Sequence, residues 1–305
     1  MRSAPREPTT RRKRSDVDKV LDALSKALDF GTTADLLTYD FVQQALLAAA
    51  VLGVLAGVLG PLIVSRQWSF AVHGSSELSL TGASAALLAG LAVGVGAILG
   101  SVIAAVLFAL LGRRARERDS VIGVIMSFGL GLSVLFLWAY PGRTGTSFSL
   151  LVGQIVGVGS TGLGLLLGVA VVVLLVLLVV YRPLLFASTD PEGAEARGVP
   201  MRALSIVFAV LVGVACALGV QIVGALLVLS LLITPAAAAS RVTANPVTAT
   251  VLSVVFAEVA AVGGILLSLA PGVPVSTFVT TISFVIYLVC RAVGRRTPAR
   301  VPAAA

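Results

Sequence analysis

Long apolar runs, separated by short polar breaks, extend from about residue 41 almost to the end of the chain. Several of these runs reach the roughly 18–20 residues that cross a bilayer as an α-helix. They do not alternate polar and apolar residues, as the strands of a membrane β-barrel would. The pattern therefore predicts about nine membrane-spanning helices, at residues 41–65, 78–96, 97–112, 119–140, 161–181, 203–220, 222–240, 246–269 and 275–291.

Two parts of this pattern allow more than one interpretation. Residues 78–112 are rich in glycine and have no polar break, so they fit either two spans or one tilted helix followed by a partial one. Residues 147–158 are apolar but too short to cross a bilayer, and we expect an interfacial or re-entrant helix there.

The segment ahead of the first span is polar. Residues 1–14 are basic and rich in Pro and Thr, which predicts disorder. Residues 15–30 place apolar side chains on one helical face, which predicts an amphipathic helix at the membrane surface or against the body of the protein. We therefore divide the chain into a basic tail with an N-terminal helix (1–40), a transmembrane domain (41–292) and a C-terminal tail (293–305).

Composition supports a membrane protein and excludes a soluble one. Hydrophobic residues make up 58% of the chain, charged residues 12%, and the mean hydropathy is +1.05. A soluble domain could not cover that much apolar surface. The fold class is therefore all-α, a polytopic bundle of transmembrane helices in contact with lipid. Cys216 and Cys290 both fall in apolar runs, where we expect buried small hydrophobic side chains.

The net charge of +8 does not indicate a nucleic-acid partner, because the basic residues gather at the chain ends and in short loops. Nine spans place three arginine clusters on one side, which the positive-inside rule assigns to the cytoplasm. The same count places the basic N-terminus outside. Either the first 40 residues contain a cytoplasmic surface helix and the count is off by one, or the tail is translocated.

Few ionisable residues fall at membrane depth, where each is costly and therefore a candidate site residue. His73 and Glu77 are four residues apart and share a face on a helix. An imidazole and a carboxylate together can bind a divalent transition metal. Glu258 lies within a long apolar run, and we weigh a role in an ion pathway equally with a carboxyl group that merely faces a neighbouring helix. Gln154 and Gln221 are expected to form hydrogen bonds between helices.

These groups do not form a closed metal site. His73 is the only histidine, so the chain cannot build a His/Cys cage of the structural zinc kind. We expect instead a transient path lined by carboxylate, hydroxyl and carbonyl oxygens. The sequence also has no Walker loop, no HExxH motif and no nucleophile elbow, so we expect neither an enzyme nor a bound cofactor.

A short polar run at residues 189–198 separates two long apolar segments and predicts a small capped helix. Thr189 or Asp190 is placed to cap it, Pro191 suits the first turn, and Gly198 suits a left-handed exit. Glu192 and Glu195 favour the positive end of the helix.

Four short sequence motifs occur in order along the chain. They are Gly60–Arg66, Asp119–Ser127, Leu151–Val156 and Val223–Arg241, the last of which reads V-G-A-L-L followed by P-A-A-A-A-S-R. With these motifs, the chain from about Phe41 to Arg291 resembles the membrane permease subunits of bacterial ABC importers for zinc, manganese and iron, the ABC-3 metal permease family.

The resemblance implies a type II ABC importer permease in the bacterial plasma membrane, working as a homodimer with a cytoplasmic ATP-binding subunit and an extracytoplasmic metal-binding protein. It implies that the run 189–198 is a coupling helix that contacts the ATPase. The expected coupling residues are Asp190, Glu192, Glu195, Arg197 and Gly198. The expected pathway residues for Mn, Zn or Fe are His73, Glu77 and Glu258.

One segment departs from the family pattern, F-M-G-D-A-L-S-H-A-x-L-P-G. Phe70 and Gly82 match without a gap, but His73 replaces the usual Asp, Glu77 the usual His, and Thr81 the usual Pro. Glu77 shifts the expected preference from zinc toward the harder manganese or iron. Two alternatives remain open. One is an ABC permease for another solute, such as a siderophore, another metal chelate or a vitamin. The other is a scaffold or transporter without an ATPase, although a secondary transporter would usually carry more intramembrane acids and an internal repeat.

Overall fold

The computed structural model describes residues 30–112, 115–141, 160–271 and 273–294, and every regular element in these ranges is a helix. The elements are α2 (Phe30–Leu36), α3 (Asp40–Ser65), α4 (Ser69–Leu88), α5 (Val93–Leu111), α6 (Ala115–Ala139), α8 (Ser160–Thr189), α9 (Pro191–Ala196), α10 (Met201–Val223), α11 (Ala225–Leu232), α12 (Thr234–Val242), α13 (Pro246–Leu269) and α14 (Val275–Gly294). The predicted all-α class is confirmed.

Seven of these helices are long and apolar enough to cross a membrane, namely α3, α5, α6, α8, α10, α13 and α14. Two further elements correspond to the remaining predicted spans. One is α4, which carries His73, Glu77 and several serines and so falls short in hydropathy. The other is the apolar pair α11 and α12, which together are no longer than one span. The predicted number of about nine therefore corresponds to seven clear spans and these two special elements.

The predicted boundaries around α4 are wrong. A span was expected at 78–96, whereas α4 begins at Ser69 and ends at Leu88. The first half of α4 was not predicted as part of a span because His73, Glu77 and several serines interrupt its apolar residues. The chain then turns through Gly90, whose φ of +69° suits glycine, before α5 starts at Val93. The alternative of one tilted helix with a partial one is therefore wrong as well.

The predicted span 222–240 is interrupted. α11 ends at Leu232 and α12 begins at Thr234. Pro235 lies in the first turn of α12 and has no backbone N–H to continue the hydrogen bonding of α11, so the helix is broken at this point.

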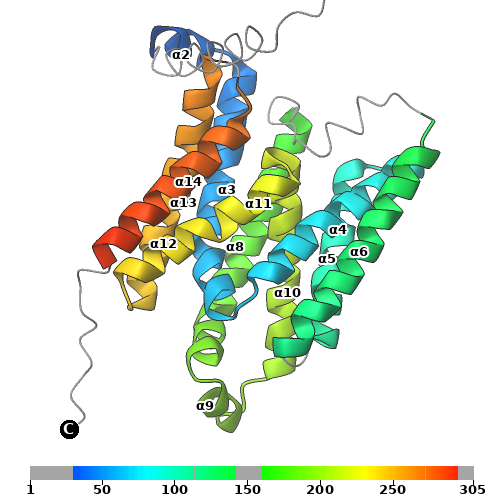
Figure 1. The fold of residues 1–305 in the computed structure, drawn as a ribbon, viewed down its shortest axis with the longest axis vertical. Helices are drawn as coiled ribbons and strands as arrows, with labels where there is room; N and C mark the ends of the chain where they lie inside the picture. Colours follow the sequence, from blue (N-terminus) through cyan, green and yellow to red (C-terminus); the bar gives the residue numbers. More distant parts are fainter. Residues whose placement is uncertain (1–29, 113–114, 142–159, 272, 295–305) are drawn as a thin grey trace, which may run out of the picture.

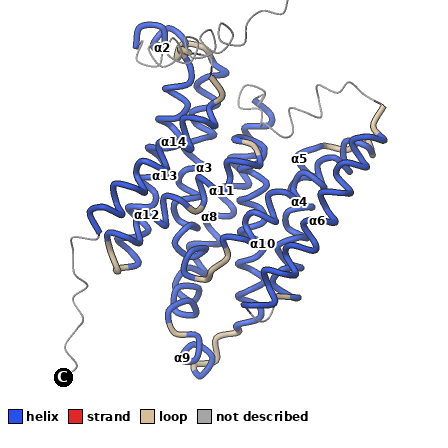
Figure 2. The backbone as a smooth tube through the Cα atoms, viewed as in Figure 1, coloured by secondary structure: helices blue, strands red, loops and turns tan. Residues whose placement is uncertain are grey.

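The helices form two flanks around a central pair (Figures 1 and 2). α3, α13 and α14 pack together on one flank, and α4, α5 and α6 on the other. α8 contacts α3, and α10 contacts α4 and α5, so this pair joins the flanks. The short helices α2 and α9 lie at opposite ends of the molecule. Phe30–Leu36 is therefore on the opposite side of the bundle from α9.

Glycines allow several helices to approach closely. Gly82 of α4 lies against the backbone of α5 at Gly96 and Gly100, so that no side chain would fit at these three positions. Gly60 of α3 similarly lies against the Leu232 carbonyl, where an added Cβ would be 2.7 Å from the oxygen. Small residues at helix interfaces are the usual means of close packing in membranes.

Several predictions concern parts of the chain outside the described residues. They are the disordered segment 1–14, the amphipathic helix at 15–30 except its last residue, the interfacial helix at 147–158 with Gln154, and the C-terminal tail beyond Gly294.

Candidate functional site

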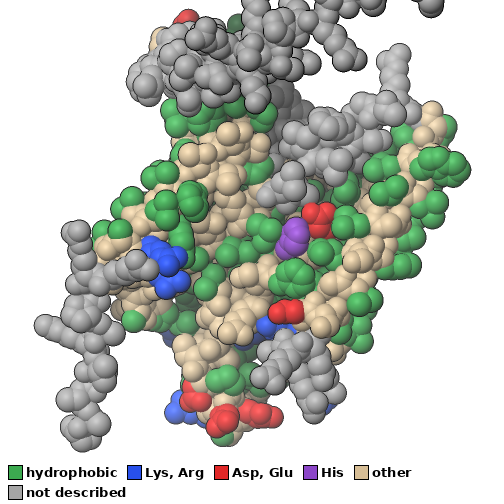
Figure 3. Space-filling view, in the orientation of Figure 1, with side chains coloured by type: hydrophobic (Ala, Val, Ile, Leu, Met, Phe, Trp, Pro, Cys, Tyr) green, Lys and Arg blue, Asp and Glu red, His purple; other side chains and the backbone are tan. Residues whose placement is uncertain are grey.

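α4 carries the predicted His73–Glu77 pair one turn apart on a single face, and both side chains are partly exposed. The His73 Nδ1 atom is buried and makes no hydrogen bond with any of the described residues. Its ring centroid lies 6.3 Å from that of Phe70. Figure 3 shows a histidine on the surface with an acidic side chain beside it. An unpaired imidazole nitrogen one turn from a carboxylate is a two-residue arrangement suited to a metal ion.

The next turn of α4 is fixed to α6 through hydroxyl groups. Thr81 Oγ1 lies 2.8 Å from Ser133 Oγ and 3.0 Å from the Gly129 carbonyl oxygen, and its proton can be donated to either acceptor. Ser133 in turn donates to Gly129 at 3.0 Å within its own helix. The polar face His73–Glu77–Thr81 is thereby held in position at its far end. From the sequence, Thr81 was identified only as a replacement for the proline of the family pattern.

Glu258 lies elsewhere, at the contact of α13 with α3. A Cβ atom added to Gly53 would be 2.6 Å from Glu258 Oε1, so the carboxyl group is packed directly against this glycine. The Oε1 atom is buried and has no hydrogen-bond partner in the ranges that the structure describes. In the described part of the chain, His, Cys, Asp and Glu residues form no group of three that could hold a metal ion. The structure thus brings His73 and Glu77 together and leaves Glu258 apart from them.

The short helix predicted at 189–198 is present as α9, and its predicted cap and exit are confirmed. Of the two acidic residues expected at its positive end, only Glu192 lies in the first turn, whereas Glu195 lies near the other end of this short helix. Of the two candidate caps, Asp190 is the one used: its Oδ1 accepts from the Gly193 N–H at 2.9 Å, and Pro191 occupies the first turn. Gly198 has a φ of +79°, and its N–H donates to the Glu195 carbonyl at 2.9 Å. This is the left-handed exit that favours glycine.

α9 presents charge to solvent and buries only one side chain. Glu192, Glu195 and Arg197 are exposed, whereas Ala194 is fully buried. The Arg197 guanidinium stacks 5.2 Å from the Phe186 ring centroid at the end of α8. Acidic and basic side chains gather at this tip of the molecule (Figure 3). The tip is therefore a small, rigid, polar projection on an otherwise apolar bundle.

A family model described as the ABC 3 transport family matches residues 38–294. The chain belongs to the ABC 3 transport family. It is 30% identical over 234 residues to the manganese transport system membrane protein MntC of Halalkalibacterium halodurans, covering 76% of this chain and 80% of the relative. It is 29% identical over 252 residues to the manganese import system permease protein ScaB of Streptococcus parasanguinis, covering 82% of this chain and 90% of the relative.

A solved structure described as PsaBC from Streptococcus pneumoniae in complex with Fab matches with a TM-score of 0.79 at 26% identity. The match covers 88% of this chain and 98% of that chain. This ABC 3 chain is thus a multi-pass protein of the bacterial plasma membrane, as the sequence predicted. The alternative of a transporter or scaffold unrelated to ABC systems is wrong.

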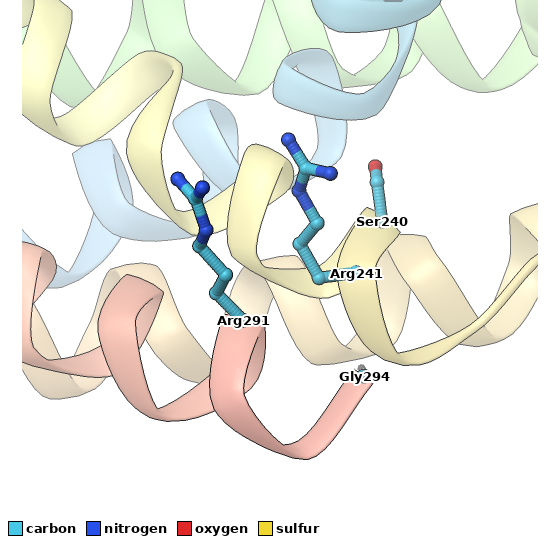
Figure 4. Close-up of a pocket in the computed structure, with 4 residues that line it drawn as sticks. All are labelled: Ser240, Arg241, Arg291 and Gly294. Atoms are coloured by element: carbon cyan, nitrogen blue, oxygen red, sulfur yellow. The ribbon is translucent and has the colours of Figure 1, made fainter. Parts of the chain in front are cut away.

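The motif Val223–Arg241 of this ABC 3 chain ends at a basic pocket that the sequence did not predict. Arg241 at the end of α12 and Arg291 near the end of α14 line a cavity of about 280 Å³ with Ser240 and Gly294. Both guanidinium groups point to the same side (Figure 4). In the sequence, each arginine served only to indicate the cytoplasmic side of the membrane. The two arginines are 50 positions apart, and they become neighbours only because α12 contacts α14.

Within the described part of the chain, Gln221 forms no hydrogen bond between helices of the kind expected of it. Its amide donates to the Ala217 carbonyl at 3.3 Å within α10, and the side chain packs against Gly94 of α5. Both cysteines are buried, as predicted.

Proposed function

We propose that this chain is the permease subunit of an ABC importer that moves a divalent transition-metal ion, with manganese as the favoured ion. The observation that carries the proposal is the His73–Glu77 pair, which places an imidazole nitrogen without a hydrogen-bond partner and a carboxylate on one face of α4. The similarity to two permeases named for manganese supports the choice of metal.

The chemistry of the pair suits passage rather than storage. One nitrogen and one carboxylate leave most coordination positions of the ion to water, so the ion is held weakly enough to be released. A carboxylate favours manganese or iron(II) over zinc more than a second imidazole would. The Thr81 hydroxyl, one turn along α4, keeps this face polar beyond Glu77.

We assign α9 to the cytoplasm by the positive-inside rule, because Arg66, Arg118 and Arg197 lie at or near helix ends on its side of the bundle. α2 then lies on the outer side. The exposed charges of α9 fit the role of a coupling helix seated in a groove of the ATP-binding subunit. Movement of that subunit would open the pathway alternately to each side. We further propose that two copies of the chain form the pathway and that an extracytoplasmic binding protein delivers the ion.

The test is manganese uptake by proteoliposomes that contain the permease, its ATPase and its binding protein. We expect the His73→Ala/Glu77→Ala double variant to lose nearly all uptake while it assembles normally. The control is Thr250→Val, which removes one contact between α8 and α13 at 2.8 Å and leaves α4 untouched. Full uptake by the double variant would refute the proposal.

A metal chelate is the second candidate cargo, because both metal-binding positions of this segment differ from the family pattern. Free Mn²⁺ and a siderophore-bound metal, supplied to the same proteoliposomes, distinguish the two. Uptake of only the chelated form would favour the second candidate.

A further inference from the structure

The turn between α3 and α4 is three residues long and unusual in conformation. Arg66, Gln67 and Trp68 separate Ser65 from Ser69. Gln67 has a φ of +55°, the one left-handed conformation of a non-glycine residue among the described residues. Such a conformation is strained for an L-residue and persists only where the surrounding contacts hold it. Contacts between this turn and the neighbouring helices must therefore hold Gln67 in its strained conformation.

Arg66 joins the turn to the end of α8. Its Nε donates to Ser188 Oγ at 2.8 Å, and a terminal nitrogen donates to the Leu184 carbonyl at 3.4 Å. Ser188 uses its own proton on the same Leu184 carbonyl, at 2.6 Å, which leaves its lone pairs for Arg66. These two acceptors lie in the last two turns of α8, directly ahead of α9.

The rest of the turn is held just as firmly. The Arg66 guanidinium lies 5.0 Å from the ring centroid of Phe208 in α10, and Trp68 meets the same ring edge-on at 5.3 Å. From the other side, Arg118 of α6 donates to the Gln67 carbonyl at 2.7 Å. Burial lowers the pKa of the Arg66 guanidinium below its ordinary range, and an arginine side chain stays charged at neutral pH.

The turn leads directly into the metal-binding face. Trp68 precedes α4, and its carbonyl accepts from the Val72 N–H at 3.0 Å, one residue before His73. At the other end of the link, α8 continues into α9 with a single intervening residue, Asp190. A continuous chain of contacts therefore runs from α9 through the end of α8 and Arg66 to the first turn of α4. Such contiguous contacts are what can carry coupling between distant sites.

We infer that Arg66 is a positioning residue that transmits movement of α9 to the His73–Glu77 pair. The inference rests on the proposed function for the identity of the cargo, but the contacts themselves do not depend on it. A displacement of α9 moves the last turns of α8 first. Because Arg66 is bound to those turns and Phe208 backs its guanidinium, the start of α4 moves with them. Gln67, whose backbone is strained, is the hinge about which α4 can rotate while α3 stays in place.

The first experiment measures manganese imported and ATP hydrolysed in the same proteoliposomes containing the complete transporter. The Arg66→Gln variant is expected to lower the manganese-to-ATP ratio about tenfold, within the usual range of coupling between sites. Arg66→Lys keeps the charge but loses the two-point contact, so it should fall between Arg66→Gln and the unmodified protein. Ser188→Ala should lower the ratio too. Thr250→Val, the matched loss of another hydroxyl contact of α8, should leave it unchanged.

A merely structural role gives a different result, in which Arg66→Gln lowers the melting temperature and the yield but leaves the manganese-to-ATP ratio unchanged. That result would overturn the inference.

The second experiment does not depend on the cargo. Spin labels at Ala196 in α9 and Phe70 in α4, both on exposed positions, report the distance between the two helices. In the otherwise unmodified protein this distance should stay constant when ATP binds, because the helices move together, whereas Arg66→Gln should let it change by several ångströms. A distance that changes without the Arg66 substitution refutes the link. A transporter that imports no metal yet keeps the distance constant would refute only the proposed cargo.

Discussion

The hydroxyl groups of Thr81 and Ser133 lie 2.8 Å apart and join α4 to α6 one turn beyond Glu77. Ser133 is buried, with 2% of its surface exposed, so this hydrogen bond forms in a dry environment. The contact sets the distance between the helix that carries the proposed metal ligands and its neighbour.

Removal of either hydroxyl should destabilise the protein. We expect Thr81→Val and Ser133→Ala each to lower the free energy of unfolding by about 1 kcal/mol, the usual net value of a hydrogen bond. Because the residues contact each other, the double variant should lose less than the sum of the two. Thermal unfolding of all four proteins in one detergent measures this, and strictly additive losses would show that the contact contributes nothing.

Glu77 should influence which metal is carried. Replacement of Glu77 by His restores a nitrogen ligand and should lower the ratio of manganese to zinc uptake, because imidazole suits zinc better than a carboxylate does. Uptake from a mixture of both ions at equal concentration gives the ratio directly. Glu258→Gln is the control, because this carboxyl lies on α13 against Gly53 and should not affect the ratio. A change with Glu258→Gln and none with Glu77→His would move the selective site to α13.

The exit of α9 should tolerate little change. Gly198 needs a φ of +79°, and proline fixes φ near −65° and also removes the N–H that binds the Glu195 carbonyl. We expect Gly198→Pro to uncouple ATP hydrolysis from uptake while the bundle stays folded, and Glu195→Lys to do the same by reversing an exposed charge. Full ATPase stimulation together with full uptake in both variants would show that α9 is an ordinary loop helix.

The contact between Gly53 and Glu258 makes a prediction about packing. A methyl group at position 53 would lie 2.6 Å from Glu258 Oε1, so Gly53→Ala should displace the end of this flexible side chain and cost about 1 kcal/mol of stability, the low end of the usual overpacking range. Replacement of Glu258 by Ala in the same chain should restore much of that loss. Gly123→Ala is the matched control, since an added Cβ there meets nothing within 4 Å. Equal melting temperatures for Gly53→Ala and Gly123→Ala would contradict the packing described here.

Local signals in the sequence predicted the long spans and α9 well. An apolar run of sufficient length has few structures open to it in a membrane, and the Asp190, Pro191 and Gly198 signals act within one short helix. His73 and Glu77 were recognised as neighbours for the same reason, because helical spacing alone places them on one face.

Features that depend on distant residues were not predicted. Arg66 appeared only as a marker of topology, since its partners Ser188 and Leu184 lie 122 and 118 positions away. The start of α4 was missed because His73, Glu77 and the serines near them lower the hydropathy of residues 69–77. The partner of Thr81, Ser133, lies 52 positions away, so this contact with α6 was not predicted either.

The close approach of α4 and α5 at their glycines also determines where the protein can be chemically modified. Positions 82, 96 and 100 face the neighbouring backbone and leave no room for a reporter group. Gly131, Gly164 and Gly168 have nothing within 4 Å of an added Cβ. A dye or cross-linker placed at the second set can therefore follow the transport cycle, whereas the first set must be left as it is.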